Sequence, residues 1–313
     1  MPASPHLLIP YAVGSSDGGP AAGVPPSGLP NLRRLLAVMA PERTIETPED
    51  CPAMPHELAL AAALGLPIEP GCTPWAAHET GTVGTPCAFV RLCHWQVGMD
   101  RVYVLDPALL ALSDDESRRL MQAAAPWFAE DGILLSHHLP GVWLATGEPF
   151  RRQRAISLDR VIGRPVSREL LQSVDAPGHP LTRLQSEMQL LLYDHPVADE
   201  RMKRGQLHPN AIWFTGAGVL EEALPQRPDL RIEGRLGRPP WLAEPAVHEA
   251  AWREVDATSV ADLARKAARK APVRLTLCGE RRAITFAPHP GGFMARLAHR
   301  FGAADSAALL ATL

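Results

Sequence analysis

The sequence predicts an α/β fold with a mixed-sheet core, and three observations lead to it. Short apolar runs typical of buried strands alternate along the chain with helical patterns, beginning with HLLIPYAVG at 6–14. Residues 86–166 carry a β-α-β-β pattern of their own. Proline and glycine are frequent, with 32 and 24 residues among 313, so we expect many short elements joined by turns.

The N-terminal part should contain one strand and two helices. A loop rich in Gly, Pro and Ser follows the first strand at 15–30. Helices are predicted over 31–39 and 55–64, the second with Pro55 at its start, where the missing N–H costs nothing. The stretch 69–84 has no regular pattern, and we expect a domain boundary there.

The β-α-β-β pattern predicts a smaller α+β subdomain. Its first two strands are CAFVRLCHW at 87–95 and RVYVLDP at 101–107. Ser113 and Glu116 form a capping box that opens an amphipathic helix. The strands GILLSHH and GVWLATG follow, with the turn Pro140-Gly141 between them.

Two further helices and a strand are predicted after this subdomain. Thr182 with Gln185 would cap the first helix, which ends before Pro196. Its apolar stripe has the spacing i, i+4, i+7, i+8: Leu184, Met188, Leu191 and Leu192. A short helix is expected over 197–204, and a buried strand over 211–215.

The C-terminal part should return the chain to the core. A helix with a basic face is predicted over 259–271 and a hairpin over 273–288. We therefore expect an α/β core made of 1–85 and 167–313, with 86–166 as the smaller subdomain.

Composition excludes several classes of protein. The 31 basic and 34 acidic residues give a net charge of −3, without the basic excess of a nucleic-acid-binding domain. No apolar run reaches the roughly 18–20 residues that span a bilayer, and the first residues lack the features of a signal peptide. The five cysteines form no CxxC pair and read as reduced thiols. A cytoplasmic protein that binds neither nucleic acid nor membrane is expected.

The segment HPNAIWFTGAG at 208–218 looks most like a functional part. A buried strand runs into Gly216-Ala217-Gly218, as in many phosphate-binding turns. A phosphate would need a helix N-terminus directly after the glycines, yet Glu221 and Glu222 lie there and would repel an anion. Glycines that only allow a positive φ after the strand are the simpler explanation.

Several other residue groups leave two interpretations open. His195 near Arg201 could contribute to a polar pocket, or to a capped helix end with surface charges. Trp95 could face a ligand or pack in the core. No HExxH, DxDG or GxSxG motif is present.

Several segments resemble one known protein family. They are PWAA (74–77), CHWQVGMDRV (93–102), WFAEDG (127–132), SLDRVIGRPV (157–166), RLQSEMQLLLYDHPVADERMKRG (183–205) and NAIWFTGAG (210–218). Together they look like the regulatory RpfE-type proteins, which are often labelled cofactor-independent phosphoglycerate mutases. The resemblance is best over 70–230, and it implies a truncated fold of the phosphoglycerate mutase and alkaline phosphatase type.

The mutase label depends on the segment from His195 to Gly218, which is similar to one in archaeal-type phosphoglycerate mutases. In that superfamily the resemblance implies two divalent metals held by Asp and His, and a Ser or Thr nucleophile. Here Pro10 and Tyr11 occupy the strand end where the first metal ligand is expected. Ala198 replaces a family asparagine, and 236–313 lacks the downstream ligand motifs.

The resemblance therefore implies a non-catalytic regulatory protein that binds a small metabolite or a protein partner, with no catalytic residue, metal site or cofactor. The candidate pocket residues are Trp95, Asp159, Arg160, His195, Arg201, Asn210, Trp213, Gly216 and Gly218. The alternative is a metal-dependent phosphomutase or phosphatase that uses Asp17, Asp106, Asp159 and scattered histidines. A purely structural interaction protein is the third hypothesis.

Overall fold

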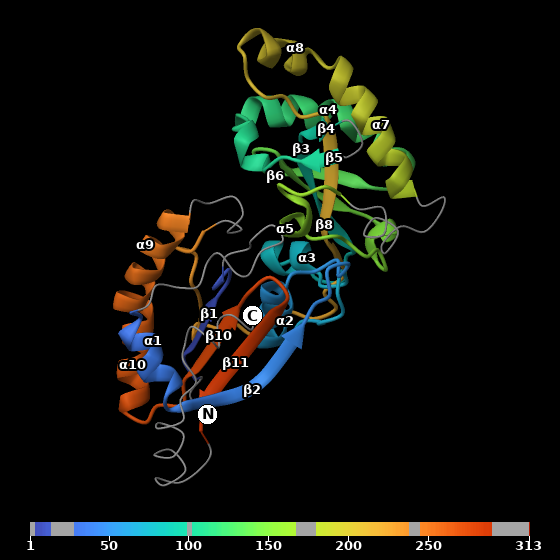
Figure 1. Ribbon diagram of the computed structural model, residues 1–313. Helices are drawn as coiled ribbons and strands as arrows, with labels where there is room; N and C mark the ends of the chain where they lie inside the picture. Colours follow the sequence, from blue (N-terminus) through green and yellow to red (C-terminus); the bar gives the residue numbers. More distant parts are fainter. Residues whose placement is uncertain (1–3, 14–27, 99–101, 167–179, 238–244, 290–312) are drawn as a thin grey trace. The chain divides into compact units, whose positions relative to one another are not determined.

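The computed structural model describes residues 4–13, 28–98, 102–166, 180–237, 245–289 and 313. It divides the chain into two compact units (Figure 1). Unit 1 comprises 1–49, 54–64 and 225–313, and unit 2 comprises 50–53 and 65–224. Unit 1 is thus built from both ends of the chain, and most of unit 2 is inserted between them.

Unit 1 contains a mixed sheet, which confirms the predicted α/β class. Its described strands are β1 (His6–Ile9), β2 (Met39–Glu46), β9 (Leu230–Ile232), β10 (Arg274–Cys278) and β11 (Arg282–Pro288). They lie in the order β2-β11-β10-β1-β9. β1 runs parallel to β9 and β10, whereas β11 runs antiparallel to β10 and β2.

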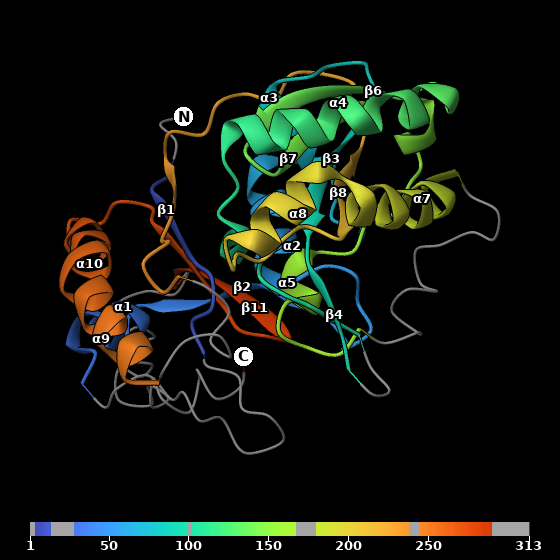
Figure 2. The same cartoon turned by 90° about the horizontal axis from the view of Figure 1, so that it is seen from above.

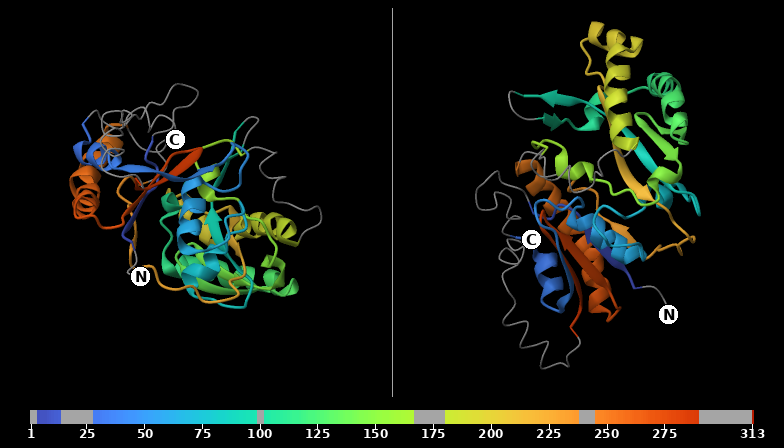
Figure 3. Two further views of the ribbon diagram at one scale, coloured as in Figure 1. Left: turned by 90° about the horizontal axis from the view of Figure 1, so that it is seen from below. Right: turned by 90° about the vertical axis from the view of Figure 1, so that its right-hand side faces the viewer.

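Helices cover both faces of this sheet. They are α1 (Pro30–Leu36), α2 (Pro55–Leu64), α9 (Pro245–Val255), the π-helical segment Asp256–Val260 and α10 (Ala261–Ala268). In Figure 3, α1 and α2 lie on opposite sides of β10 and β11. The sequence explains this, because alternate residues of a strand point to opposite faces.

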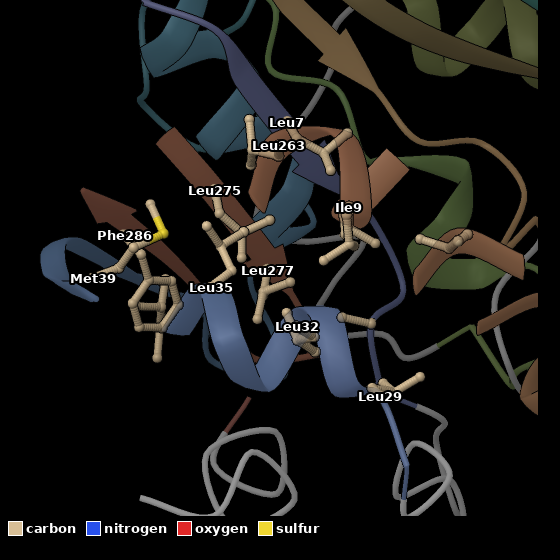
Figure 4. Close-up of a cluster of buried hydrophobic side chains, with 14 of the residues drawn as sticks. Leu7, Ile9, Leu29, Leu32, Leu35, Met39, Leu263, Leu275, Leu277 and Phe286 are labelled. Atoms are coloured by element: carbon tan, nitrogen blue, oxygen red, sulfur yellow. The ribbon is translucent and has the colours of Figure 1, made fainter. Parts of the chain in front are cut away.

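The side chains of β1 divide between two apolar clusters. Leu7 and Ile9 pack with Leu32 of α1 and Trp252 of α9 in the main core, much of which is shown in Figure 4. Leu8 points the other way, into a smaller cluster with α2. Each face of the sheet is therefore buried by its own helices.

Unit 2 contains an antiparallel sheet in the order β6-β7-β3-β8. Its described strands are β3 (Cys87–Cys93), β6 (Leu134–Leu139), β7 (Val142–Thr146) and β8 (Ala211–Gly218). β4 (Trp95–Val97) and β5 (Val102–Val104) form a separate two-stranded hairpin.

Helices α3, α4 and α7 pack on this sheet, and α8 packs against α4 and α7 (Figure 2). They are α3 (Trp75–Thr80), α4 (Asp114–Glu130), α5 (Leu158–Val161), α7 (Pro180–Asp194) and α8 (Pro196–Lys203), with 3-10 turns at Pro107–Leu110 and Glu148–Phe150. The predicted capping box of Ser113 and Glu116 opens α4. Leu184, Met188 and Leu192 form the predicted buried stripe of α7.

The division into units differs from the predicted one. Residues 65–85 and 167–224, which the sequence assigned to the core, belong with 86–166 in unit 2. The reason is that β8 pairs with β3, and α7 packs on β8. Pairing between distant strands is not visible in local sequence patterns.

Several predicted elements also differ. β2 begins at Met39, the last residue of a predicted helix, and its other residues and those of α3 had no predicted element. β9 and α9 were missed as well. α7 begins at Pro180, so that Thr182 lies inside the helix and does not cap it. In the described part of the chain, no helix combines the length and apolar character needed to cross a membrane.

Candidate ligand-binding sites

Arg201, in α8, is buried and holds several chain segments together. Its Nη1 donates to Glu116 Oε2 at 2.9 Å, and its Nε donates to the carbonyl oxygen of Leu207 at 2.7 Å. Its Nη2 donates to the carbonyl oxygen of Leu110. Although burial alone would raise the pKa of Glu116, the hydrogen bonds from Ser113 and Arg201 lower it below its usual value. The guanidinium group therefore has a structural use in unit 2.

His195 lies at the N-cap of α8. Its Nδ1 accepts a hydrogen bond from the backbone N–H of Val197 at 3.2 Å. Burial lowers the pKa of the imidazole, with Arg119 as the next contribution, and this favours the neutral form that an N-cap acceptor requires. Of the two interpretations of the sequence, this geometry corresponds to the capped helix end.

Asn210 connects β8 to the β4–β5 hairpin through Trp95. Its Oδ1 accepts from the Trp95 backbone N–H at 2.7 Å, and its Nδ2 donates to the Trp95 carbonyl at 3.0 Å. The indole rings of Trp95 and Trp213 meet edge to face with centroids 6.0 Å apart. Trp213 Nε1 donates to the carbonyl of Ile156 at 2.9 Å. The indole N–H of Trp95 is buried without a partner among the described residues.

Arg160 and Asp159 lie in the short helix α5. Arg160 is buried, and its Nε and Nη2 donate to the carbonyl of Ala53 at 3.1 and 2.9 Å. The backbone N–H of Asp159 donates to Ser157 Oγ at 3.2 Å. This bond caps α5.

The two glycines lie inside β8, whereas the sequence predicted a turn after the strand. Gly216 has φ +62°, and a Cβ there would lie 2.8 Å from the backbone nitrogen of Ala76. At Gly218, with φ +145°, a Cβ would lie 3.0 Å from Cβ of Pro74. Pairing with β3 shifts register beside them. The glycines thus let β8 bulge and approach the start of α3 closely.

All the candidate residues lie in unit 2, where Asn210 and Trp213 both contact Trp95. The others have separate partners, mostly backbone groups. The described residues contain no group of three or more His, Cys, Asp or Glu side chains arranged to hold a metal ion. Asp106 caps the 3-10 turn through a hydrogen bond from the Ala108 N–H at 2.9 Å. Asp17 lies outside the described residues.

Unit 1 contains a pocket of about 410 Å³ on the α2 face of its sheet. Its described lining comes from α2, from the loop before β9 and from strands β1, β2, β10 and β11: His6, Glu42, Arg43, Ile45, Ala59, Ala62, Ala63, Arg227, Arg274 and Thr285. The volume lies within the range of small-molecule sites. It opens beside the first residues of β1 and β10, at the amino ends of these parallel strands, whereas ligands of open α/β sheets usually bind at the carboxyl ends.

Bidentate ion pairs hold two of the three arginines of this pocket, Arg227 and Arg274. Arg274 donates to Glu42 through Nε at 2.7 Å and Nη2 at 3.0 Å. Arg227 donates to Asp229 through Nε at 3.0 Å and Nη2 at 2.8 Å, and its Nη1 donates to the carbonyl of Ala63. Such paired contacts fix the position of a guanidinium group.

His6 is a buried residue of the pocket lining. Its Nε2 lies 2.8 Å from Thr276 Oγ1, which in turn lies 2.8 Å from Thr285 Oγ1. Burial, followed by the charges of Arg274 and Arg227, lowers the pKa of His6 to about 4. The imidazole is therefore neutral near pH 7 and can donate or accept a hydrogen bond.

Comparison with known proteins shows distant similarity to solved structures. No family model and no curated protein matches the chain. The cofactor-independent phosphoglycerate mutase from Thermoplasma acidophilum DSM 1728 is 16% identical with a TM-score of 0.36, over 91% of this chain and 90% of that one. The PH0037 protein from Pyrococcus horikoshii is 12% identical with a TM-score of 0.45, over 91% and 88%. At these scores no functional residue is transferred, and the RpfE-type resemblance stays a prediction.

The unit 1 pocket was missed by sequence reasoning. Its charged lining residues come from positions as far apart as His6 and Arg274, none of them in a recognised motif. The small residues Ala59, Ala62 and Ala63 on the predicted helix 55–64 could have indicated a pocket, because small side chains on a helix leave space beside a sheet.

Proposed function

We propose that this chain is a non-catalytic, phosphoglycerate-mutase-like regulatory protein of the RpfE type that acts by binding a small metabolite. The observation that carries the proposal is the pocket of about 410 Å³ in unit 1, which combines fixed guanidinium groups with a neutral histidine. Concave sites with a few well-placed polar groups are typical of small-molecule binding.

The contacts made by side chains of the mutase-like segment (His195 to Gly218) support the non-catalytic part of the proposal. Arg201 and Asn210 direct their side chains to backbone groups of unit 2. Gly216 serves a close contact between β8 and α3. These residues have a structural function that would preserve the segment without any chemistry.

Thermal shift over a panel of metabolites tests the binding function. A ligand that binds only the folded chain raises its apparent stability by mass action, by about 2.7 kcal/mol at a hundredfold excess over Kd. At least one metabolite should raise Tm in a concentration-dependent manner. A panel without any shift would contradict the proposal and leave a protein partner as the ligand class.

A mutase assay tests the alternative, a metal-dependent phosphomutase or phosphatase. Interconversion of 2- and 3-phosphoglycerate is measured with added manganese or zinc, against a control without protein. We expect no turnover above the control. Turnover that is lost on Asp159→Asn would establish the alternative.

A further inference from the structure

We propose that the unit 1 pocket binds the anionic group of a small organic molecule, a carboxylate or phosphate, whose apolar part lies on the alanine face of α2. The inference rests on the proposed metabolite-binding function and names the chemical class of its ligand.

Charge is the first argument. Among the described residues at the pocket, three guanidinium groups (Arg43, Arg227 and Arg274) accompany two carboxylates. Glu42 pairs with Arg274, and Asp229 pairs with Arg227. Arg43 makes no side-chain ion pair or hydrogen bond within the described part of the chain, although its charge adds a small contribution to the lowering of the Glu42 pKa, which is due first to Arg274. One positive charge is thus left in excess, which favours an anion and disfavours a cation.

Preorganisation is the second argument. Asp229 is largely buried behind Arg227, with 6% of its side chain exposed, and the Ala63 carbonyl fixes the same guanidinium group from another direction. Arg274 donates to Glu42 through Nε and Nη2, and its Nη1 makes no hydrogen bond among the described residues. This Nη1 can therefore donate to a ligand. Donors that are already held in place lose little freedom when they bind an oxyanion.

The neutral groups complete the recognition of an oxygen-bearing ligand. His6 and Thr285 line the pocket, and the buried Thr276 joins them in a hydrogen-bonded row across β1, β10 and β11. Their placement follows from strand register, because His6 pairs with Arg274 and Thr276 pairs with Thr285, which puts all four side chains on the α2 face.

The opposite wall is apolar and made of small side chains. Ala59, Ala62 and Ala63 occupy one face of α2 at i, i+3 and i+4, and Ile45 of β2 also lines the space. A hydrated inorganic ion gains nothing from such a wall, whereas an organic anion can bury carbon on it. The combination therefore points to an amphipathic small acid.

The test compares benzoate with benzamide, which has a similar shape and no charge, and with inorganic phosphate. Binding to the full-length protein is followed by NMR shifts of the α2 backbone amides during titration. Benzoate should bind more tightly than benzamide, and its affinity should fall as salt rises. Phosphate should bind more weakly than benzoate.

Three variants assign the effect to the pocket. Arg43→Gln should weaken benzoate binding about tenfold, because it removes one charge a few ångströms from the anion. Glu42→Gln removes a negative charge from the pocket but keeps an amide oxygen that can accept from Arg274, so it should strengthen benzoate binding. A purely structural role would not give this opposite sign. Arg34→Gln, an exposed arginine on α1 at the other face of the sheet, is the matched control and should change nothing. Melting curves of all variants verify folding.

Four outcomes would overturn the inference: no binding of any probe, equal binding of benzoate and benzamide, tighter binding of phosphate than of benzoate, or equal affinities in Arg43→Gln and the wild type. Neutral or cationic metabolites that raise Tm would support metabolite binding while overturning this ligand class. Mutase turnover would overturn the non-catalytic function and leave the anion site standing. The two proposals are thus tested separately.

Discussion

At the scale of single residues, conspicuous side chains of the mutase-like segment bond to the chain itself. Arg201 has three acceptors within unit 2, and Asn210 bonds both backbone groups of Trp95. Bonds of this kind stabilise the fold of unit 2 and leave the activity undetermined. The charged pocket in unit 1 has no corresponding motif.

Glu116 allows a direct comparison of how much a buried and an exposed ion pair contribute to the free energy of unfolding. It pairs with Arg201, whose side chain is 3% exposed, and with Arg204, whose side chain is 50% exposed. Arg201→Gln should lower the free energy of unfolding by about 3–5 kcal/mol, because Glu116 keeps only its exposed partner and the carbonyls of Leu207 and Leu110 lose their charged donor. Arg204→Gln should cost at most about 1 kcal/mol. Urea denaturation measures both, and equal losses would contradict this account.

His6 should make stability depend on pH. Its pKa is lowered from 6.5 to about 4, first by burial and then by Arg274 and Arg227, while Asp229 and Glu42 act in the opposite direction. Between these values the unfolded chain binds a proton that the folded chain does not, so stability falls as pH drops from about 6.5 to 4. The loss is on the order of 3 kcal/mol.

The variant His6→Gln isolates this contribution from that of the carboxylates. Urea denaturation of both proteins at several pH values between 7 and 4 should show a shallower loss of stability in the variant. Parallel curves would show that His6 already titrates near its ordinary pKa in the folded protein.

At the level of helices and strands, patterns that lie within one element predicted that element correctly. The capping box at Ser113, the stripe of α7 and helix α2 are all present. β2 was missed because MAPERTIE is mostly exposed and polar, and it becomes a strand through its pairing with β11. Tertiary context decides such edge strands.

Gly216 in β8 should tolerate no side chain. Gly216→Ala should cost about 3 kcal/mol or more, because the strain of a positive φ adds to a clash with α3. Gly205→Ala is the matched control: its φ is +65°, and a Cβ there meets nothing within 4 Å. It should cost only about 1–2 kcal/mol. Similar losses of Tm in both variants would show that α3 can shift to accommodate the added Cβ without a loss of stability.

At the scale of the whole molecule, unit 1 has its own sheet and core although its sequence is interrupted. The two ends of the interruption lie close, because Arg227 Nη1 donates to the carbonyl of Ala63. An insertion between adjacent ends is the arrangement in which a domain is expected to fold alone.

Excision of the inserted part should therefore leave a folded unit. In the variant, a flexible linker of about six Gly and Ser residues replaces 65–224, long enough to join ends that are held by one side chain. It should show cooperative thermal unfolding and keep the benzoate site, since every described lining residue of the pocket is retained. Non-cooperative melting would show that unit 1 depends on unit 2 for its stability.

Local patterns along the chain were enough to predict the α/β class and most of the strongly patterned helices and strands. These follow from hydrophobic period, caps and turn residues, which act over a few positions. Long-range contacts place 65–85 and 167–224 in unit 2 and bring His6, Arg227 and Arg274 to one pocket. No local pattern encodes them, because strand pairing between distant segments sets these contacts and register places each side chain on one face or the other.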